Sequence, residues 1–224
     1  MTGFIRPTNV IFDMDGVIFD SERKVLECWQ EVAAENGMEN VRDVFIKCIG
    51  TNSARTKEIF LAAYGDSLPY DELRSEMSAR YHERCDGGRL PLKKGIRELL
   101  VSLRDCGCRT AIASSTRTFV IKQQIHDAGL DGLFDSITGG DSVTRSKPDP
   151  MIFLKAAELL GAEPAQTYVI EDSFNGIRAA YAGGFIPLMV PDMLPPDGEM
   201  REKARYIARD LFEIKDILTG QESI

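Results

Sequence analysis

The feature that most constrains this chain is a short apolar run that ends in two acidic residues one position apart. Residues 10–12 read Val-Ile-Phe, Asp13 and Asp15 follow, and Gly16 comes directly after. β-Branched and aromatic residues predict a buried strand, and the glycine predicts the turn that ends it. The strand therefore delivers two carboxylates to one edge of a sheet. A bare Asp-x-Asp is equally typical of an acidic turn that caps a strand, so its partners elsewhere in the chain decide its meaning.

No second strand is predicted until well beyond this run, because the next segments have helical spacing of their apolar residues. We expect helices over residues 21–36, 41–47, 53–64 and 70–84, with Ser21 as the N-cap of the first. The Gly16 turn and the glycine pair at residues 87–88 are suited to hinges at the two ends of this insert. We therefore predict a helical domain over residues 20–89, inserted into a core domain of residues 1–19 and 90–224.

Beyond residue 92 the sequence alternates regularly between helix and strand. An amphipathic helix is expected at residues 96–103, followed by strands at 109–113, 134–137, 167–170, 186–190 and 205–208. The helices between them are expected at 118–128, 151–160, after Ser173, and at 211–218. This alternation predicts an α/β fold, a doubly wound parallel sheet with helices on both faces and right-handed crossovers.

Ligands of such sheets bind at the carboxyl ends of the strands, where several polar residues of this chain are expected to meet. Besides the first acidic pair, these residues are Ser114, Lys147, Glu171 and Asp172. Singly, the serine reads as a helix cap, the lysine as a surface cation, and the later acidic pair as a solvated turn. Two carboxylate clusters brought together would repel each other unless a cation lies between them. Oxygen ligands without histidine or thiolate indicate Mg²⁺.

The cysteines and histidines argue against other kinds of site. The five cysteines are odd in number and lack the paired spacing of a metal site, and Cys106 and Cys108 fit a turn between a helix and a strand. The two histidines, His82 and His126, fall on predicted surface helices. A zinc site built from histidines, or a Ser-His-Asp triad, is therefore not expected.

Charge and hydropathy limit the partners and the location. The net charge of −8 argues against nucleic acid or an anionic membrane surface as the main partner. No apolar run reaches the roughly 20 residues that cross a bilayer, and residues 1–8 lack the apolar segment of a signal peptide. We therefore expect a cytoplasmic protein that does not bind membranes. No sequence feature fixes the oligomeric state, and we favour a monomer.

Taken together, four motifs resemble those of the haloacid dehalogenase-like superfamily of phosphohydrolases. The resemblance is to the branch with a helical cap after the first strand, which includes β-phosphoglucomutase-like proteins. The motifs are residues 13–17 (Asp-Met-Asp-Gly-Val), 113–115 (Ala-Ser-Ser), 146–150 (Ser-Lys-Pro-Asp-Pro) and 170–173 (Ile-Glu-Asp-Ser). Each is weak alone, but their order and spacing make the resemblance specific, and it covers nearly the whole chain. It implies a Rossmann-like core under a lid, here called the cap (residues 20–89).

The resemblance also implies roles for the first acidic pair. Asp13 would be the nucleophile that forms an aspartyl-phosphate, and it would also ligate Mg²⁺. Asp15 would act as general acid and then as general base, with its backbone carbonyl on the metal. Dehalogenases, phosphonatases and transport ATPases of the superfamily lack a carboxylic acid at this second position. Asp15 therefore favours phosphate-ester chemistry.

The remaining motifs would complete the site in the same way. The resemblance implies that Asp172 is a metal ligand and that Glu171 is a ligand or a partner of one. Ser114, Ser115 and nearby backbone amides would hold phosphoryl oxygens. Lys147 would neutralise the charge that develops on those oxygens in the transition state.

The cap is where the sequence departs from β-phosphoglucomutase. Val25 stands where that enzyme has a histidine that helps to control proton transfer. The arginine of the glycine-containing cap loop, Arg55, comes two residues late for the grip on a distal phosphate. Arg55 and Arg117 are kept as candidate substrate contacts, although a solvated helix cation is the commoner role of such residues.

These observations favour a Mg²⁺-dependent phosphatase that acts on a small phosphorylated metabolite, in the first place a sugar phosphate. A β-phosphoglucomutase is the nearest alternative. A non-catalytic phospho-acceptor module is an alternative of another class, because such modules also surround Mg²⁺ with acidic residues, a hydroxyl and a lysine. Modules of that kind have about 120 residues and no cap, so the helical insert and Asp15 argue against it.

Overall fold

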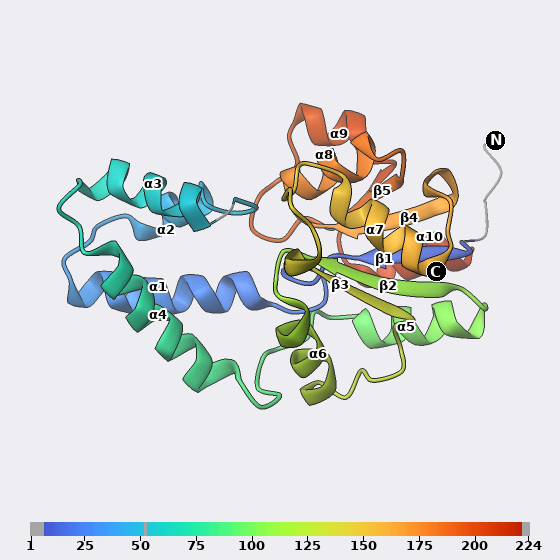
Figure 1. The fold of residues 1–224 in the computed structure, drawn as a ribbon, viewed down its shortest axis with the longest axis horizontal. Coiled ribbons are helices and arrows are strands. Elements are labelled where there is room, and N and C mark those ends of the chain that lie inside the picture. Colours follow the sequence, from blue (N-terminus) through green and yellow to red (C-terminus); the bar gives the residue numbers. More distant parts are fainter. Residues whose placement is uncertain (1–6, 52, 221–224) are drawn as a thin grey trace.

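The computed structural model describes residues 7–51 and 53–220. Its elements form two groups that lie side by side along the longest axis, a sheet covered by helices and a separate set of helices (Figure 1). The sheet has six strands in the order β3-β2-β1-β4-β5-β6, and every neighbouring pair is parallel. The strands are β1 (Asn9–Phe12), β2 (Arg109–Ser114), β3 (Ser136–Gly139), β4 (Thr167–Glu171), β5 (Ile186–Met189) and β6 (Tyr206–Ile207). The predicted doubly wound α/β fold is confirmed.

The position of β1 in the middle of the sheet places the first acidic pair between two other strand ends. Phe12 is in register with Ile112 of β2 on one side and with Ile170 of β4 on the other. The residues that follow these three positions therefore emerge at the same edge. All four residues of β1 are buried, which explains why the run has no polar alternation.

Helices cover both faces of the sheet. They are α5 (Ile96–Asp105), α6 (Thr118–Asp127), α7 (Met151–Leu160), α8 (Phe174–Ala182), α9 (Gly198–Lys203) and α10 (Leu211–Thr219), with short 3₁₀ helices η1 (Gly140–Ser142) and η2 (Pro164–Gln166). Val10 and Phe12 pack in one hydrophobic cluster with α5, α6 and α10, whereas Ile11 packs in another with α7 and α8. The alternation of side chains along β1 thus joins two hydrophobic layers into one core.

Local details differ from the sequence-based expectations. The six-residue helix α9 was not predicted, and the last strand is only Tyr206–Ile207, because both segments are short and mostly polar. The expected N-cap role of Ser21 is wrong: Asp20 occupies the N-cap position of the first helix, and its side chain makes no capping bond. The expected N-cap at Ser173 is confirmed, since its Oγ accepts a hydrogen bond from the backbone N–H of Gly176 at 3.0 Å.

The four helices of the cap region pack around a hydrophobic cluster of their own. They are α1 (Ser21–Glu35), α2 (Val41–Ile46), α3 (Ser53–Tyr64) and α4 (Tyr70–Cys85). The indole of Trp29 lies 4.5 Å from the ring of Phe60 and 6.0 Å from that of Tyr70, measured between centroids, and all three residues are buried. Aromatic rings at such distances add about 0.5–1.5 kcal/mol per pair to the burial of their surface.

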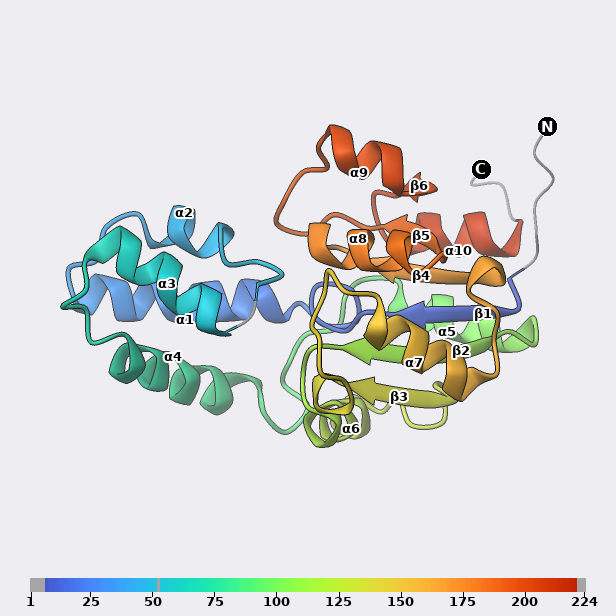
Figure 2. The same ribbon diagram turned by 45° about the horizontal axis from the view of Figure 1, so that its top comes forward.

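The chain passes between the two groups at two neighbouring segments, which Figure 2 shows beside the carboxyl end of β1. The segments are hydrogen-bonded to each other: the N–H of Asp20 donates to the carbonyl of Pro91, and that of Lys93 to the carbonyl of Ile18, both at 2.9 Å. Phe19 and Leu92 form an antiparallel bridge between them. The predicted boundaries at residues 20 and 89 lie at or beside these paired linkers, and the division into two domains stays a prediction.

Among residues 7–51 and 53–220, no helix combines the length and the apolar character that a membrane span requires.

Candidate active site

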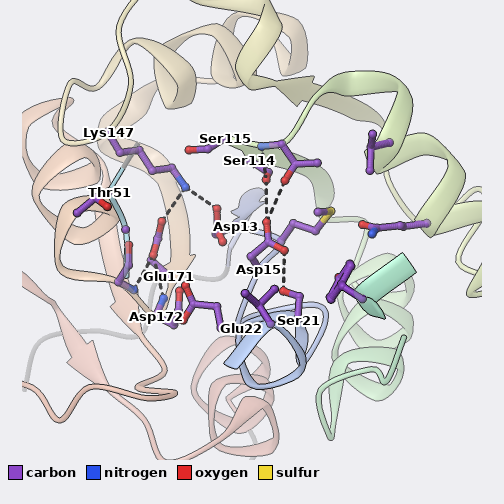
Figure 3. Close-up of a pocket in the computed structure, with 18 of the residues that line it drawn as sticks. Asp13, Asp15, Ser21, Glu22, Thr51, Ser114, Ser115, Lys147, Glu171 and Asp172 are labelled. Carbon is purple, nitrogen blue, oxygen red and sulfur yellow. Dashed lines mark hydrogen bonds and ion pairs between the residues drawn. The ribbon is translucent and has the colours of Figure 1, made fainter. Parts of the chain in front are cut away.

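A pocket with a volume of about 390 Å³ lies between the carboxyl ends of the strands and the cap helices. Figure 3 shows the polar side chains that converge in it from β1, the loop after β2 and the end of β4. The pocket brings together the residues that the four motifs predicted. These lining residues are Asp13, Asp15, Ser114, Ser115, Lys147, Glu171 and Asp172.

Lys147 is held between two carboxylates at the base of the pocket. Its ammonium lies 2.5 Å from Oδ1 of Asp13 and 2.7 Å from Oε1 of Glu171, and only 7% of its side chain is exposed. The ammonium also lies 4.8 Å from the centre of the buried Phe153 ring. Burial opposes the charge of the lysine, but the two carboxylates outweigh it and raise its pKa. Lys147 is therefore a fixed positive charge beside Asp13.

Glu171 has both carboxylate oxygens engaged within the protein. Oε1 accepts from Lys147, while Oε2 accepts from the backbone N–H groups of Asp172 at 2.9 Å and Ser173 at 2.8 Å. A Cβ at Gly176 would lie only 1.7 Å from Oε1, so α8 can approach this carboxylate only with glycine at that position. The contacts make Glu171 a residue that positions Lys147 and the start of the loop before α8.

Asp15 is held by hydroxyl groups on the other side of the pocket. Ser21 donates to Oδ1 at 2.6 Å, while Thr116 at 3.1 Å and Ser114 at 3.5 Å donate to Oδ2. Figure 3 shows this set apart from the ion pair of Lys147 with Asp13. The carboxyl of Asp15 is thereby oriented by α1 and by the loop after β2. This orientation suits a group that gives and takes protons.

Three carboxylates near Asp13 have the geometry of a metal site. One oxygen each of Asp13, Glu171 and Asp172 lies within 4.8 Å of the other two, and all three residues are buried. A Cβ at Gly16 would lie 2.2 Å from Oδ2 of Asp172, so this carboxylate rests directly against the backbone that follows Asp15. Buried oxygen donors without nitrogen or sulfur fit a hard divalent cation such as Mg²⁺. Since Glu171 is engaged elsewhere, Asp13 and Asp172 are the candidates for direct ligands.

The protonation of these carboxylates depends on neighbouring charge. The pKa of Asp13 is raised to about 8: burial is the largest cause, Lys147 acts in the opposite direction, and the charges of Glu171 and Asp15 add to the rise. Burial raises the pKa of Asp172 as well, with Glu22 as the next cause. The close contact with Lys147 favours the ionised form of Asp13. A divalent cation would add positive charge to the same end and so favour the carboxylate that a nucleophile needs.

The two arginines that the sequence suggested as substrate contacts lie elsewhere. Arg55 is 62% exposed in its side chain and pairs with Glu58 at 2.7 Å. Arg117 precedes the first residue of α6 and is not among the residues that line the pocket. A contact between either arginine and a substrate stays a prediction.

The upper part of the pocket is formed by residues that sequence reasoning did not select. Tyr81 and His82 of α4, Thr51 of the loop before α3, and Gln124 of α6 line it together with Val25. Burial raises the pKa of Tyr81, with the charge of Asp15 as the next cause, so its hydroxyl remains protonated near neutral pH. Among the site residues that were not selected from the sequence, only Thr116 could have been found there, because it follows the motif residue Ser114 by two positions. The other contacts depend on how the cap is placed over the core.

Comparison with known proteins gives a consistent result. The haloacid dehalogenase-like hydrolase family matches residues 10–190. The phosphorylated carbohydrates phosphatase of Thermotoga maritima is 31% identical over 178 residues, which are 78% of this chain and 81% of that protein. The validoxylamine A 7'-phosphate phosphatase of Streptomyces hygroscopicus subsp. limoneus is 28% identical over 92% of this chain and 94% of its own length.

A solved structure agrees on the fold. The β-phosphoglucomutase of Clostridium difficile superposes with a TM-score of 0.72 over 96% of this chain and 98% of its own. Its sequence identity of 20% limits this likeness to the fold.

Proposed function

Because the chain belongs to the haloacid dehalogenase-like hydrolase family, we propose that it is a Mg²⁺-dependent phosphatase that hydrolyses a small phosphorylated metabolite, in the first place a sugar monophosphate. Its class is that of the phosphoric monoester hydrolases. One observation carries the proposal: Asp13 is buried against the fixed charge of Lys147 at 2.5 Å, while Asp15 is held apart by three hydroxyl groups. The two carboxylates thus have different surroundings, which suit Asp13 to act as the nucleophile and Asp15 to act as the general acid and base.

In the first step, a carboxylate oxygen of Asp13 attacks the phosphorus atom of the substrate. The bond between phosphorus and this oxygen forms while the bond to the ester oxygen breaks, and Asp15 gives its proton to the departing oxygen. Lys147 neutralises charge on the phosphoryl oxygens, and Ser114 and Ser115, which line the pocket, are assigned to their binding.

In the second step, water attacks the phosphorus of the aspartyl-phosphate. Asp15, now ionised, takes a proton from the water, and the bond between phosphorus and Asp13 breaks to release inorganic phosphate. Mg²⁺, held by Asp13 and Asp172, would supply positive charge to the phosphoryl group. Residues of the cap line the pocket beside those of the core, and a cap in this place would limit the access of bulk water during both steps.

The pocket residues support a substrate with a single phosphate. Lys147 is the only lysine or arginine among the residues that line this pocket, and it is already paired with two carboxylates. The described lining therefore offers no further lysine or arginine to a second phosphate. Val25 lines the pocket where β-phosphoglucomutase uses a histidine, and a valine side chain makes no hydrogen bond that could restrain Asp15. We therefore favour hydrolysis over isomerisation of a sugar phosphate.

The test is a screen for release of inorganic phosphate from a panel of sugar monophosphates, nucleotides and small phosphorylated acids. We expect steady turnover with Mg²⁺, loss of turnover in EDTA, and recovery when Mg²⁺ is returned. Full activity in the chelator would remove Mg²⁺ from the proposal. A single equivalent of acyl phosphate without turnover would indicate a phospho-acceptor instead.

The same panel separates the phosphatase from the mutase. β-Glucose 1-phosphate is incubated with and without a glucose bisphosphate, and both glucose 6-phosphate and inorganic phosphate are measured. We expect phosphate release without a requirement for the bisphosphate. Bisphosphate-dependent isomerisation much faster than phosphate release would replace the phosphatase with a β-phosphoglucomutase.

A further inference from the structure

Asp192, in the loop after β5, is a buried carboxylate with only one oxygen satisfied. The exposed fraction of its side chain is 1%. Its Oδ1 accepts from Arg23 at 2.9 Å and from Lys93 at 2.8 Å. Its Oδ2 is buried and has no hydrogen-bond partner among residues 7–51 and 53–220. An unpaired buried carboxylate oxygen costs several times what an ordinary hydrogen bond contributes, so a ligand for it is expected.

Two further carboxylates meet Asp192 at this place. One oxygen each of Glu22, Asp172 and Asp192 lies within 4.8 Å of the other two. Oε2 of Glu22 is also buried, and in the part of the chain that the structure describes it has no hydrogen-bond partner. The three side chains come from the first turn of α1, the end of β4 and the loop after β5. The cluster therefore joins the cap helix to two segments of the core.

The charges around this cluster do not balance. Asp20 also approaches the two basic residues, at 3.2 Å from Arg23 and 3.5 Å from Lys93. Arg23 and Lys93 thus pair with Asp20 and Asp192, whereas within the described residues no basic side chain pairs with Glu22 or Asp172. Both basic groups approach Asp192 at Oδ1, so they leave Oδ2 available. Buried like charges of this kind are stabilised by a metal cation.

We propose that Glu22, Asp172 and Asp192 form a second divalent-cation site, which shares Asp172 with the catalytic group. It is distinct from the group of Asp13, Glu171 and Asp172, because it contains neither the nucleophile nor the partners of Lys147. Carboxylate oxygens select a hard cation such as Mg²⁺, Mn²⁺ or Ca²⁺.

Such a cation would fix the entry of the cap helix. Glu22 directly follows Ser21, whose hydroxyl donates to Asp15 at 2.6 Å. A cation that ties Glu22 to Asp172 and Asp192 would hold this serine over the general acid, so it would act through position and not in the chemical steps. The site extends beyond the proposed phosphatase reaction, which needs only the catalytic metal.

The test is a titration of the full chain with Mn²⁺, in which electron paramagnetic resonance measures the free ion. We expect two bound Mn²⁺ ions per chain, and one in Asp192→Asn. Asp20→Asn is the matched control, because Asp20 contacts the same arginine and lysine but lies outside the trio, and it should keep two ions. Glu22→Gln is a second variant from the cap side and should also bind one ion. Thermal melting of each variant checks that it is folded.

The outcomes are distinguishable. One ion per chain in the wild type, or two in a folded Asp192→Asn, would overturn the second site. An equal loss in Asp20→Asn and Asp192→Asn would assign the effect to the ion pairs instead. Steady phosphate release with one bound ion would exclude the second site and support the proposed phosphatase. Two bound ions without turnover would support the second site and exclude the proposed phosphatase.

Discussion

At the scale of single residues, the position of Lys147 depends on Glu171, whose two carboxylate oxygens are both engaged within the protein. One carboxylate oxygen of Glu171 accepts a hydrogen bond from the ammonium of Lys147. The other oxygen accepts hydrogen bonds from two backbone N–H groups. Gly176 provides the space for it, because a Cβ there would lie 1.7 Å from Oε1. A small change at Gly176 of α8 should therefore affect the position of the positive charge beside Asp13.

We predict that Gly176→Ala lowers kcat by about 10²–10³-fold, the usual loss when an electrostatic contact to the reacting group is removed. Gly198→Ala is the matched control, since a Cβ there meets no atom within 4 Å and the residue also lies in a helix. It should leave kcat unchanged. The measurement is steady-state phosphate release together with thermal melting. Full activity in a folded Gly176→Ala would show that the position of Glu171 does not matter for turnover.

We predict that Asp13→Asn and Asp15→Asn fail at different steps. Asp13→Asn removes the nucleophile and should give no covalent phosphate. Asp15→Asn should lower turnover by about 10²–10⁴-fold but still form some aspartyl-phosphate from an aryl phosphate, whose leaving group needs little protonation. Rapid-quench labelling with a radioactive aryl phosphate measures the covalent species. Label on any residue other than Asp13 would contradict the mechanism.

The sequence revealed the residues of the site that follow strands, and missed those that reach it from elsewhere. Asp13, Lys147 and Asp172 could be selected because a buried strand or a motif marks their positions. Thr116 bonds to Asp15 across 101 residues of sequence, and Asp192 bonds to Arg23 across 169. A hydroxyl or carboxyl contact between residues so far apart leaves no regular spacing in the sequence that could predict it. It appears only when the packing of the cap on the core is known.

At the scale of elements, the start of α6 is held by a side chain from outside the helix. Oδ1 of Asp141 accepts from the hydroxyl of Thr118 at 2.7 Å and from its backbone N–H at 2.8 Å. These bonds lower the pKa of Asp141 from its ordinary value of 3.8, the side-chain bond being the larger cause. They satisfy one of the free N–H groups at the beginning of the helix.

We predict a pH dependence from this contact. The folded state binds the ionised carboxylate, so its stabilising effect is present above pH 3.8 and is lost as the pH falls through the lowered pKa. The wild type should therefore melt at a higher temperature than Asp141→Asn at about pH 6, and the difference should shrink at about pH 3. Thermal melting of both proteins across this range is the measurement. A difference that stays constant would exclude ionisation of Asp141 as its source.

Element prediction succeeded where the pattern of apolar residues was strong. The helix over residues 53–64 was predicted with its observed ends, and β1 was read from its continuous apolar run. The strand β3 begins at Ser136 and not at residue 134, because its pattern is mixed and the neighbouring β2 decides its register. Helix α9 packs only one buried residue, Met200, so its sequence carried little signal.

At the scale of the whole molecule, the two groups of elements have separate hydrophobic clusters. Phe60 is fully buried in the cluster of α1 to α4, and Phe153 is fully buried in the cluster between the sheet and α7. Contacts between the groups are both polar, such as the bond from Asn175 Nδ2 to the carbonyl of Gly50 at 2.6 Å, and apolar, since Cys85 of α4 packs in the core cluster. This separation allows the cap to open locally while the sheet stays intact.

We predict that Phe60→Ala destabilises the cap by about 3–5 kcal/mol and leaves the sheet protected. Amide hydrogen exchange should rise in α1, α3 and α4 but not in β1, β2 or β4. Phe153→Ala, which makes a cavity of the same kind in the core, is the matched control and should raise exchange in the strands. Equal exchange throughout the molecule in Phe60→Ala would show one cooperative unit and would argue against two domains.

The paired linkers have a consequence for how such a protein can change over evolutionary time. The bonds of Asp20 to Pro91 and of Lys93 to Ile18 hold the two ends of the insert next to each other. A segment whose ends already meet can be shortened, enlarged or exchanged without pulling apart the strands on either side. The core can therefore keep Asp13 and Asp15 in place while the inserted cap domain varies in length and sequence. New substrates would then arise by recombination at this junction, without a redesign of the sheet.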